Sequence, residues 1–472
     1  MRQINKDILK LALPSILANI TVPLVGMVDI AVAGHLDTNA ATMIGGIAIG
    51  SMLFDLLYWN FGFLRVGTGG LTAQAFGKQD WKECARILTR ALGISLGIAL
   101  CLILIQWIFV KAAFLVVDCT PEVRELASRY FFIRIWAAPA TLSLMALKGW
   151  FIGMQDSVSA MITDFVVNGM NVLMSIVLAL GITLPSAGVL VKGMGFPGIA
   201  AGTVAAQYSG LIVALLLIAV KYRSKVFEEF SSADLKGVFK GGETRRFFVM
   251  NADLFVRSLC FIAIYIGFTV ISARYGDILL AVSSIMMKIL MIFSYFTDGF
   301  AYAGEAMTGR YIGARDLPNL RKTVKWTFVW SMGLAVVFVG IYHFGGVLLL
   351  KMMTSDAVVV EASKAFLPWL VLMPVVGCAA FTWDGIFIGA TGSKEMRNSM
   401  LWSVVAFAAV WIAGVIVLNV YQPSPSGVSV APTPYGIAAM HILMGAYFAH
   451  LLARTVYLTV KSPLVYDCVK QS

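Results

Sequence analysis

Acidic side chains inside long apolar stretches are the residues of this sequence with the clearest capacity for chemistry. Asp29 lies in the run Pro23-Leu-Val-Gly-Met-Val-Asp29-Ile-Ala-Val-Ala-Gly34, with no basic residue three or four positions away. An ionisable side chain in a membrane-spanning segment is costly and is a functional candidate by default. Because burial disfavours the charged form of a carboxylate, Asp29 is suited to bind and release a proton near neutral pH. The alternative is a buried ion pair with a cation on another helix, such as Arg65.

Four more acidic residues fall in or at the ends of apolar segments in the second half of the chain. Asp253 precedes Arg257 by four positions, so we expect its charge to be neutralised within its own helix. Asp298 and Glu305 are seven apart and therefore share one helical face. Asp384 has no basic neighbour in the sequence. These residues are candidates for a second coupling site.

Uncharged polar residues mark another helical face. Asn168, Asn171 and Ser175 follow one another at spacings of three and four, which places them on one side of a helix. Such residues either join helices by hydrogen bonds or line a wet cavity, and the spacing is compatible with both. Thr203 in the next apolar segment has the same two interpretations.

Two prolines share a segment with Asp29. Pro14 and Pro23 each remove one backbone hydrogen bond from a helix and clash with the preceding turn. A helix weakened in this way could bend when the charge of Asp29 changes. A fixed kink packed against neighbouring helices is the other interpretation.

The elements that must position these residues are membrane-spanning helices. Only 13% of the 472 residues are charged, while 59% are apolar, which is far from the balance of soluble proteins. Crossing a bilayer takes about 20 apolar residues in a helix, and the sequence contains twelve such stretches. They cover roughly residues 10–34, 43–64, 91–110, 125–153, 157–181 and 196–220, and then 247–271, 279–306, 326–350, 361–390, 399–420 and 435–460.

The chain also repeats itself at an offset of 236 residues. Thr72, Gly77 and Asp80 recur as Thr308, Gly313 and Asp316, and the segment Gly149–Gly153 recurs with one difference as Gly385–Gly389. Six helices per repeat bring the chain back to its starting side, so the repeats are parallel and substrates are expected at the seam between two lobes. The expected organisation is an N-lobe at 1–220, a connection at 221–246 and a C-lobe at 247–472.

The net charge of +11 reflects membrane topology rather than a nucleic-acid partner. Of the 36 Lys and Arg residues, 23 lie in the two termini and in the second, fourth, sixth, eighth and tenth connections between the predicted spans. By the positive-inside rule, both termini face the cytoplasm. The basic connections are expected to contact anionic membrane lipid.

Enzymatic and metal functions find little support. The four histidines show no metal-ligand spacing, and no Walker A sequence suggests ATP coupling. Ser95 with His343 is the one loose candidate for an intramembrane nucleophile and base. We therefore expect a transporter without cofactor or bound metal, either driven by an ion gradient or passive, rather than an enzyme.

Together these residues resemble the multidrug and toxic compound extrusion (MATE) family, and its DinF-like branch in particular. In the opening segment of that family, a proline precedes the acidic residue by fifteen positions, as Pro14 precedes Asp29 here. The resemblance covers essentially the whole chain. It is carried by residues 13–36, Gly77–Asp80, 298–306, 384–391 and 395–400.

The resemblance implies twelve helices in two six-helix lobes and an antiporter that exchanges protons or sodium for organic compounds. It implies a cation site around Asp29, with Asn171 and Thr203. Many members carry a second acid four residues after the asparagine, where this chain has Ser175. One carboxylate supplies a sodium site poorly, so proton exchange is expected, with Na+ near Asp29 as the alternative. Some members place the ion site in the C-lobe, to which Asp253 and Asp384 correspond.

The resulting hypothesis is a proton-coupled multidrug exporter in the inner membrane of a prokaryote, acting as a monomer on cationic or amphipathic compounds by alternating access. The nearest rival is a lipid-linked oligosaccharide flippase of the same superfold. Such a protein needs a cationic cavity, and the intramembrane basic residues keep this rival open. Those residues are Arg65, Arg134, Lys148, Arg257 and Lys288.

Overall fold

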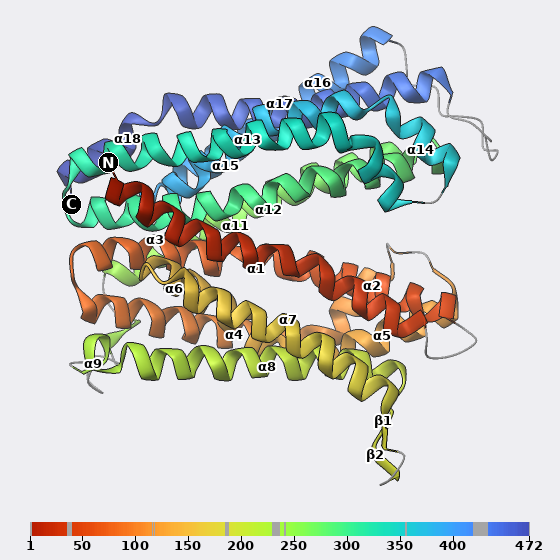
Figure 1. Ribbon diagram of the computed structural model, residues 1–472, viewed down its shortest axis with the longest axis horizontal. Helices are drawn as coiled ribbons and strands as arrows, with labels where there is room; N and C mark the ends of the chain where they lie inside the picture. The colour runs from red at the N-terminus through yellow and green to blue at the C-terminus, as the bar shows by residue number, and fades with distance from the viewer. Residues whose placement is uncertain are drawn as a thin grey trace. The chain divides into compact units, whose positions relative to one another are not determined.

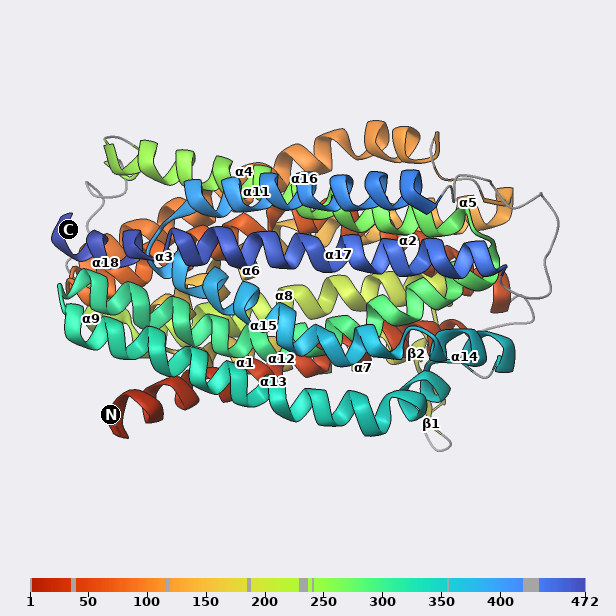
Figure 2. The same ribbon diagram turned by 90° about the horizontal axis from the view of Figure 1, so that it is seen from above.

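Long apolar helices build each half of the chain (Figures 1 and 2). The computed structural model describes residues 2–34, 40–115, 117, 119–184, 188–228, 237–239, 242–354, 356–418 and 433–471. Twelve helices or helix pairs in these residues are long and apolar enough to span a membrane. The predicted all-α membrane architecture with twelve spans is confirmed.

The first six spans are built from the following elements, some of them broken by a short 3-10 turn. They are α1 (Arg2–Gly34), α2 (Ala40–Trp59) with η1 (Asn60–Gly62) and α3 (Phe63–Gly77), α4 (Trp81–Ala113), α5 (Pro121–Arg134) with η2 (Ile135–Ala137) and α6 (Ala138–Gly153), α7 (Ser157–Leu180) and α8 (Phe196–Lys221). The short helix α9 (Arg223–Val226) follows.

The second six spans contain longer unbroken helices. They are α11 (Gly242–Ala273), α12 (Asp277–Gly313), α13 (Leu317–Met353), α15 (Leu367–Gly389), preceded by the short α14 (Ala357–Lys364), α16 (Ser393–Leu418), and α17 (Pro434–Val460) with α18 (Pro463–Gln471).

One element was not expected from the sequence. Between α7 and α8, strands β1 (Gly181–Leu184) and β2 (Gly188–Lys192) form an antiparallel hairpin. Gly181 adopts a φ of 80° as α7 ends, a backbone conformation that suits glycine. The hairpin connects two helices that carry candidate site residues.

The chain divides into two compact units. The N-terminal unit contains residues 13–248, and the C-terminal unit contains residues 1–12 together with 249–472. The first residues of α1 therefore group with the second half of the chain, where the Asn5 side chain accepts a hydrogen bond of 3.1 Å from the Trp330 indole. The sequence analysis placed residues 1–12 in the N-lobe, whereas the structure groups them with the C-terminal unit.

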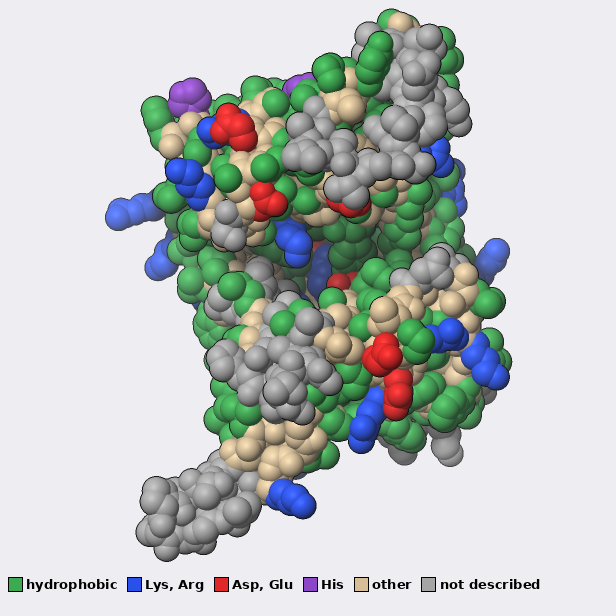
Figure 3. All heavy atoms as spheres, turned by 90° about the vertical axis from the view of Figure 1, so that its right-hand side faces the viewer, with side chains coloured by type: hydrophobic (Ala, Val, Ile, Leu, Met, Phe, Trp, Pro, Cys, Tyr) green, Lys and Arg blue, Asp and Glu red, His purple; other side chains and the backbone are tan. Residues whose placement is uncertain are grey.

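The outer faces of the helices are apolar, as contact with lipid requires. Large apolar side chains such as Ile108, Val220 and Phe344 are 71%, 82% and 88% exposed. These exposed side chains fit a lipid environment, in which apolar residues point outwards. Figure 3 shows the ends of the helices instead, where Lys, Arg, Asp and Glu side chains stand among apolar ones.

The sequence repeat is also a structural repeat. A Cβ atom on Gly149 would lie 2.1 Å from the backbone oxygen of Arg65, and one on Gly385 would lie 2.0 Å from that of Ala301. The two contacts are 236 residues apart in both partners. Because glycine has no side chain, Gly149 lets the backbone of α6 pack almost directly against that of α3. Gly385 does the same between α15 and α12.

The turns of the repeat agree as well. Gln79 and Arg315 have φ values of 58° and 57°, and Gln155 and Thr391 have 63° and 55°. Each pair is again 236 residues apart. Left-handed backbone at four non-glycine residues is uncommon, so its recurrence indicates that both halves use the same turn geometry.

A polar cluster joins the ends of α7 and α8 far from the hairpin. The Asp156 carboxylate accepts hydrogen bonds from Ser159 Oγ at 2.6 Å, Tyr222 Oη at 2.8 Å and Lys221 Nζ at 3.1 Å. Burial alone would raise the pKa of Asp156, but these hydrogen bonds outweigh it and hold the pKa below its ordinary value. The cluster fixes the relative position of two helices that carry site residues.

We predict that Gly149→Ala destabilises the protein. The new methyl group must push α6 away from α3, at a cost of about 1 to 3 kcal/mol. Thermal unfolding of the purified protein in detergent measures the loss. Gly333→Ala is the matched control, because a Cβ there meets nothing within 4 Å. Equal melting temperatures for the two variants would contradict the close packing.

We predict that Asp156→Asn lowers stability at neutral pH by about 1 to 3 kcal/mol, the range for hydrogen bonds to a charged group. Because the folded-state pKa of Asp156 is lowered, its contribution is complete at neutral pH and is lost as the pH falls through that pKa. The melting temperatures of wild type and variant should therefore converge in acid. A gap that stays constant with pH would show that the carboxylate charge is irrelevant.

Candidate functional site

Asp29 is buried in the N-terminal unit with a neutral partner. It is 5% exposed on α1, and Ser175 Oγ on α7 donates a hydrogen bond of 3.0 Å to Asp29 Oδ1. Among the residues that the structure describes, Asp29 has no ion-pair partner, and Arg65 does not pair with it. Arg134 attracts the carboxylate electrostatically at longer range. Asp29 is thus a buried acid held by a hydroxyl group.

The predicted polar residues of α7 connect it to both neighbouring helices. Asn168 Nδ2 donates to Thr21 Oγ1 on α1, and Asn171 Nδ2 donates to Thr203 Oγ1 on α8 at 3.0 Å. With the Ser175 to Asp29 bond, each of the five predicted N-lobe residues takes part in a hydrogen bond between α7 and either α1 or α8. In this conformation the three α7 side chains join helices by hydrogen bonds.

The sequence explains why α7 and α8 meet so closely here. A Cβ on Gly202 would lie 2.5 Å from the Ser175 backbone nitrogen, and one on Gly198 would lie 2.3 Å from the Leu178 oxygen. Small residues one turn apart let the helix backbones touch, which places Thr203 within reach of Asn171. The buried Asn171 Oδ1 accepts no hydrogen bond from any described residue.

Arg134 is a neighbour of Asp29 that sequence spacing did not reveal. Its guanidinium donates to Tyr130 Oη at 3.0 Å and Ser51 Oγ at 3.4 Å, and it lies 4.8 Å from the centre of the Phe54 ring. These contacts hold the cation near the end of α5, where the helix gives way to η2. The sequence marked Arg134 as an intramembrane cation without indicating its partners.

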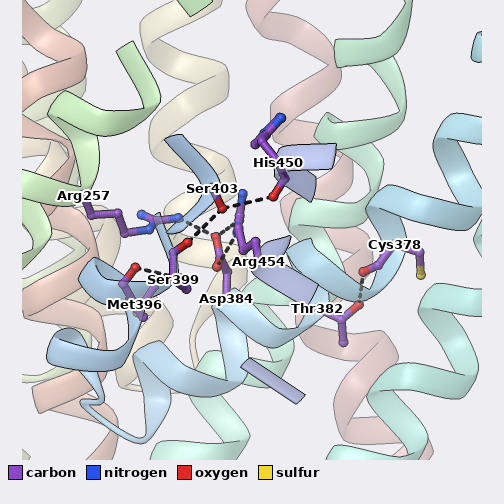
Figure 4. A network of polar contacts seen from close by, with 9 residues as sticks. All are labelled: Arg257, Cys378, Thr382, Asp384, Met396, Ser399, Ser403, His450 and Arg454. Carbon is purple, nitrogen blue, oxygen red and sulfur yellow. Dashed lines mark hydrogen bonds and ion pairs between the residues drawn. The ribbon is translucent and has the colours of Figure 1, made fainter. Parts of the chain in front are cut away.

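In the C-terminal unit, Asp384 lies between two arginines (Figure 4). Arg454 on α17 donates from Nε to Asp384 Oδ1 at 3.0 Å and from Nη2 to Oδ2, and Arg257 on α11 donates to the same Oδ2. Asp384 is 8% exposed and Arg454 is 2% exposed. The carboxylate is therefore fully paired inside the bundle. Arg454 was missed, although it lies in a predicted span where the rule that singled out the acids applies equally.

Asp253 does not follow the expected pairing. Its carboxylate pairs with Arg397 Nη1 at 2.6 Å and accepts from Ser393 Oγ at 3.0 Å, both on α16. Arg257, four residues away on α11, points instead to Asp384. The prediction of neutralisation within one helix was wrong, because guanidinium groups on neighbouring helices offer better geometry than the i, i+4 neighbour.

The remaining predicted acids lie on α12. Glu305 is fully buried and Asp298 is half-buried. Within the described part of the chain, neither forms a hydrogen bond or ion pair with Asp253 or Asp384, whose partners come from α11, α16 and α17. The four predicted C-lobe acids therefore do not form a single cluster.

The basic residues considered for a cationic cavity have different surroundings. Lys148 pairs with Asp164 at 2.7 Å, which joins α6 to α7, and Lys288 is exposed. The described residues include no group of three or more His, Cys, Asp and Glu positioned to hold a metal ion.

Twelve membrane-spanning helices in two matching halves, with buried ionisable residues in each, define a multi-pass membrane transporter. The MatE family model matches residues 14–177 and 254–431, one match in each half. The chain belongs to this family, the multidrug and toxic compound extrusion transporters, and is a transporter rather than an enzyme.

Relatives and solved structures agree with this assignment. The chain is 35% identical to DNA damage-inducible protein F of Escherichia coli strain K12, over 86% of this chain and 84% of that protein, which confirms the DinF-like branch. It is 25% identical to the probable multidrug resistance protein NorM of Photorhabdus laumondii, over 76% of each chain. The crystal structure of MATE in the bent conformation superposes with a TM-score of 0.79 at 16% identity, covering 99% of this chain and 96% of that one.

We predict that Asp384→Asn lowers the stability of the protein by about 3 kcal/mol, because it removes the carboxylate that pairs with the buried Arg454 and the half-buried Arg257. Arg257→Gln should cost less, since Arg454 still neutralises Asp384. The double variant should be more stable than Asp384→Asn alone. Unfolding in detergent measures all three variants, and strictly additive losses would argue against a paired triad.

Proposed function

We propose that this protein is a proton-coupled efflux antiporter of a prokaryotic inner membrane, with both termini in the cytoplasm. It exchanges protons for cationic or amphipathic organic compounds by alternating access. The drug-like substrate class is supported by the relative described as a probable multidrug resistance protein. The orientation is supported by the excess of Lys and Arg in the termini and even-numbered connections.

The contrast between Asp29 and two acids of the C-terminal unit, Asp384 and Asp253, carries the proposal. Asp384 and Asp253 are held by arginines, so protonating either would break an ion pair, and at Asp384 it would leave the buried Arg454 without its counterion. Asp29 is held by the neutral hydroxyl of Ser175. Protonation of Asp29 therefore breaks no direct ion pair, which suits a group that must gain and lose a proton in each transport cycle.

The mechanism follows from the charge of Asp29. The deprotonated carboxylate attracts a cationic substrate, and protonation from the outside removes that attraction and releases the substrate outwards. The proton then leaves towards the cytoplasm in the inward-open state. Protonation also changes the hydrogen bond between α1 and α7, and α1 is weakened where Pro14 and Pro23 remove backbone hydrogen bonds. In this conformation α1 is one continuous helix, although the Pro23 side chain lies outside the described part.

Sodium is the competing ion. Hard cations take several oxygen ligands, commonly including carboxylates. Asp29 supplies one carboxylate, which Ser175 contacts through its hydroxyl group, and Asn171 and Thr203 form a separate hydrogen bond between α7 and α8. A single carboxylate favours proton exchange, and separate collapse of the two gradients distinguishes the ions.

The rival function, flipping of a lipid-linked oligosaccharide, receives less support. Three of the basic residues that kept it open have defined roles: Lys148 pairs with Asp164, Arg257 pairs with Asp384, and Arg134 stacks on Phe54. Accumulation of lipid-linked precursors in a deletion strain, without loss of dye efflux, would favour the flippase.

We predict that Asp29→Asn abolishes proton-driven efflux of a cationic dye in inverted vesicles. The asparagine has the size of the acid but cannot exchange a proton. Dye movement is followed while the proton and sodium gradients are collapsed separately. Unchanged efflux in Asp29→Asn would refute the mechanism, and loss only on collapse of the sodium gradient would identify sodium as the coupling ion.

The matched control is Asp164→Asn, another acid that joins two helices of the N-terminal unit. It should retain ion-coupled efflux once corrected for the amount of folded protein, because Asp164 is paired with Lys148. Equal loss in both variants would assign Asp29 a structural role.

A further inference from the structure

A small charged cavity lies in the N-terminal unit, where the chain turns from α3 into α4. Its volume is about 180 Å³. Lys78 and Asp80 come from the short turn between the spans Thr42–Gly77 and Trp81–Ala113, so the cavity lies at a membrane surface. The rest of its wall includes Gln74, Glu83 and Arg90, and Arg246 from the start of α11.

Three cations face this cavity from different elements. The Arg90 side chain is 3% exposed, and its Nε donates to the backbone oxygen of Val238 at 2.9 Å. Arg246 reaches Gln74 Oε1 at 3.4 Å. The Lys78 ammonium forms no ion pair with any residue that the structure describes. The buried guanidinium is thus fixed in place, while Lys78 is available to a ligand.

Two carboxylates also line the cavity, and both are engaged by the protein. Asp80 Oδ1 accepts a hydrogen bond of 2.9 Å from the Glu83 backbone nitrogen and thereby caps α4. The Glu83 carboxylate lies 3.6 Å from Arg90 and 3.9 Å from Arg86. Three cations against two carboxylates leave the wall with a net positive charge.

The internal repeat separates residues needed for the turn from residues that are not. Gly77 and Asp80 recur as Gly313 and Asp316, and Asp316 caps α13 as Asp80 caps α4. Three charged wall residues do not recur: at the same offset, Lys78, Glu83 and Arg90 align with Ala314, Asn319 and Trp326. The same turn therefore folds without these charges, which suggests that they serve another purpose.

We propose that this cavity binds the phosphate group of a small anion, presented either by a phospholipid headgroup or by a soluble phosphate compound. Arginine forks and lysine are the usual ligands of phosphate, and basic pockets between membrane helices accept lipid headgroups. Sites for drug-sized ligands have volumes of about 300 to 1,000 Å³, and this cavity is smaller. It is thus suited to a phosphate group rather than to a transported drug.

The test is thermal unfolding of the full-length protein in detergent, titrated with dihexanoylphosphatidylglycerol or with inorganic phosphate. Dihexanoylglycerol and sodium chloride of matched ionic strength are the reference additives. We expect a saturable rise in melting temperature that requires phosphate. A response to the lipid alone identifies a headgroup site, and a response to inorganic phosphate identifies a site open to soluble compounds.

Variants tie the response to the cavity. Lys78→Ala introduces the residue that the repeat carries at Ala314, so the turn should fold, and Arg246→Gln removes a second cation. Each should weaken the apparent affinity about tenfold, the loss expected for one charge-assisted hydrogen bond. Lys322→Ala, an exposed cation of the corresponding turn region, should respond as wild type does. No saturable shift with either probe, or equal shifts in all variants, would overturn the proposal without bearing on transport.

Discussion

A charged side chain inside a membrane protein loses its hydration, so ion pairs or hydrogen bonds must stabilise the charge instead. This requirement accounts for the contacts of the buried charged side chains in the described interior. Asp384 lies between Arg257 and Arg454, Asp253 is held by Arg397, and Lys148 is held by Asp164. Each pair also ties two or more helices together. Asp29 is the acid whose compensation comes from a hydroxyl group and a distant cation. The proposed transport chemistry uses this difference.

The two halves share a backbone and differ in their charges. Two features of the backbone recur in both halves. Gly149 and Gly385 each pack directly against a backbone carbonyl of a neighbouring helix, and the turns contain residues with left-handed backbone conformation. At the repeat offset, Asp384 aligns with Lys148, a residue of opposite charge. Each forms an ion pair within its own unit, Asp384 with Arg257 and Arg454, and Lys148 with Asp164. Duplication thus preserved the geometry of packing while the ionisable side chains took separate roles.

Much of this arrangement was predictable from the sequence. Apolar stretches long enough to cross a membrane predict the twelve spans. The spacings of three and four along α7 predict which of its side chains share a face, and these side chains contact α1 and α8. Pairing between distant helices was less accessible, because spacing indicates which residues share a face but not which residue of another helix lies opposite. Asp253 shows this limit, since its partner is Arg397 rather than the neighbour four residues on. The hairpin between α7 and α8 was missed because its short strands lie in a connection.

The assignment of α1 to both units has a structural consequence. Residues 2–12 of this helix group with the C-terminal unit and residues 13–34 with the N-terminal unit, yet the helix is continuous from Arg2 to Gly34. Pro14 and Pro23 lie along this helix between Asn5 and Asp29, and each removes one backbone hydrogen bond. The indole of Trp330 holds the Asn5 end. The helix that carries the proposed coupling acid therefore also supplies Asn5 to the packing of the C-terminal unit.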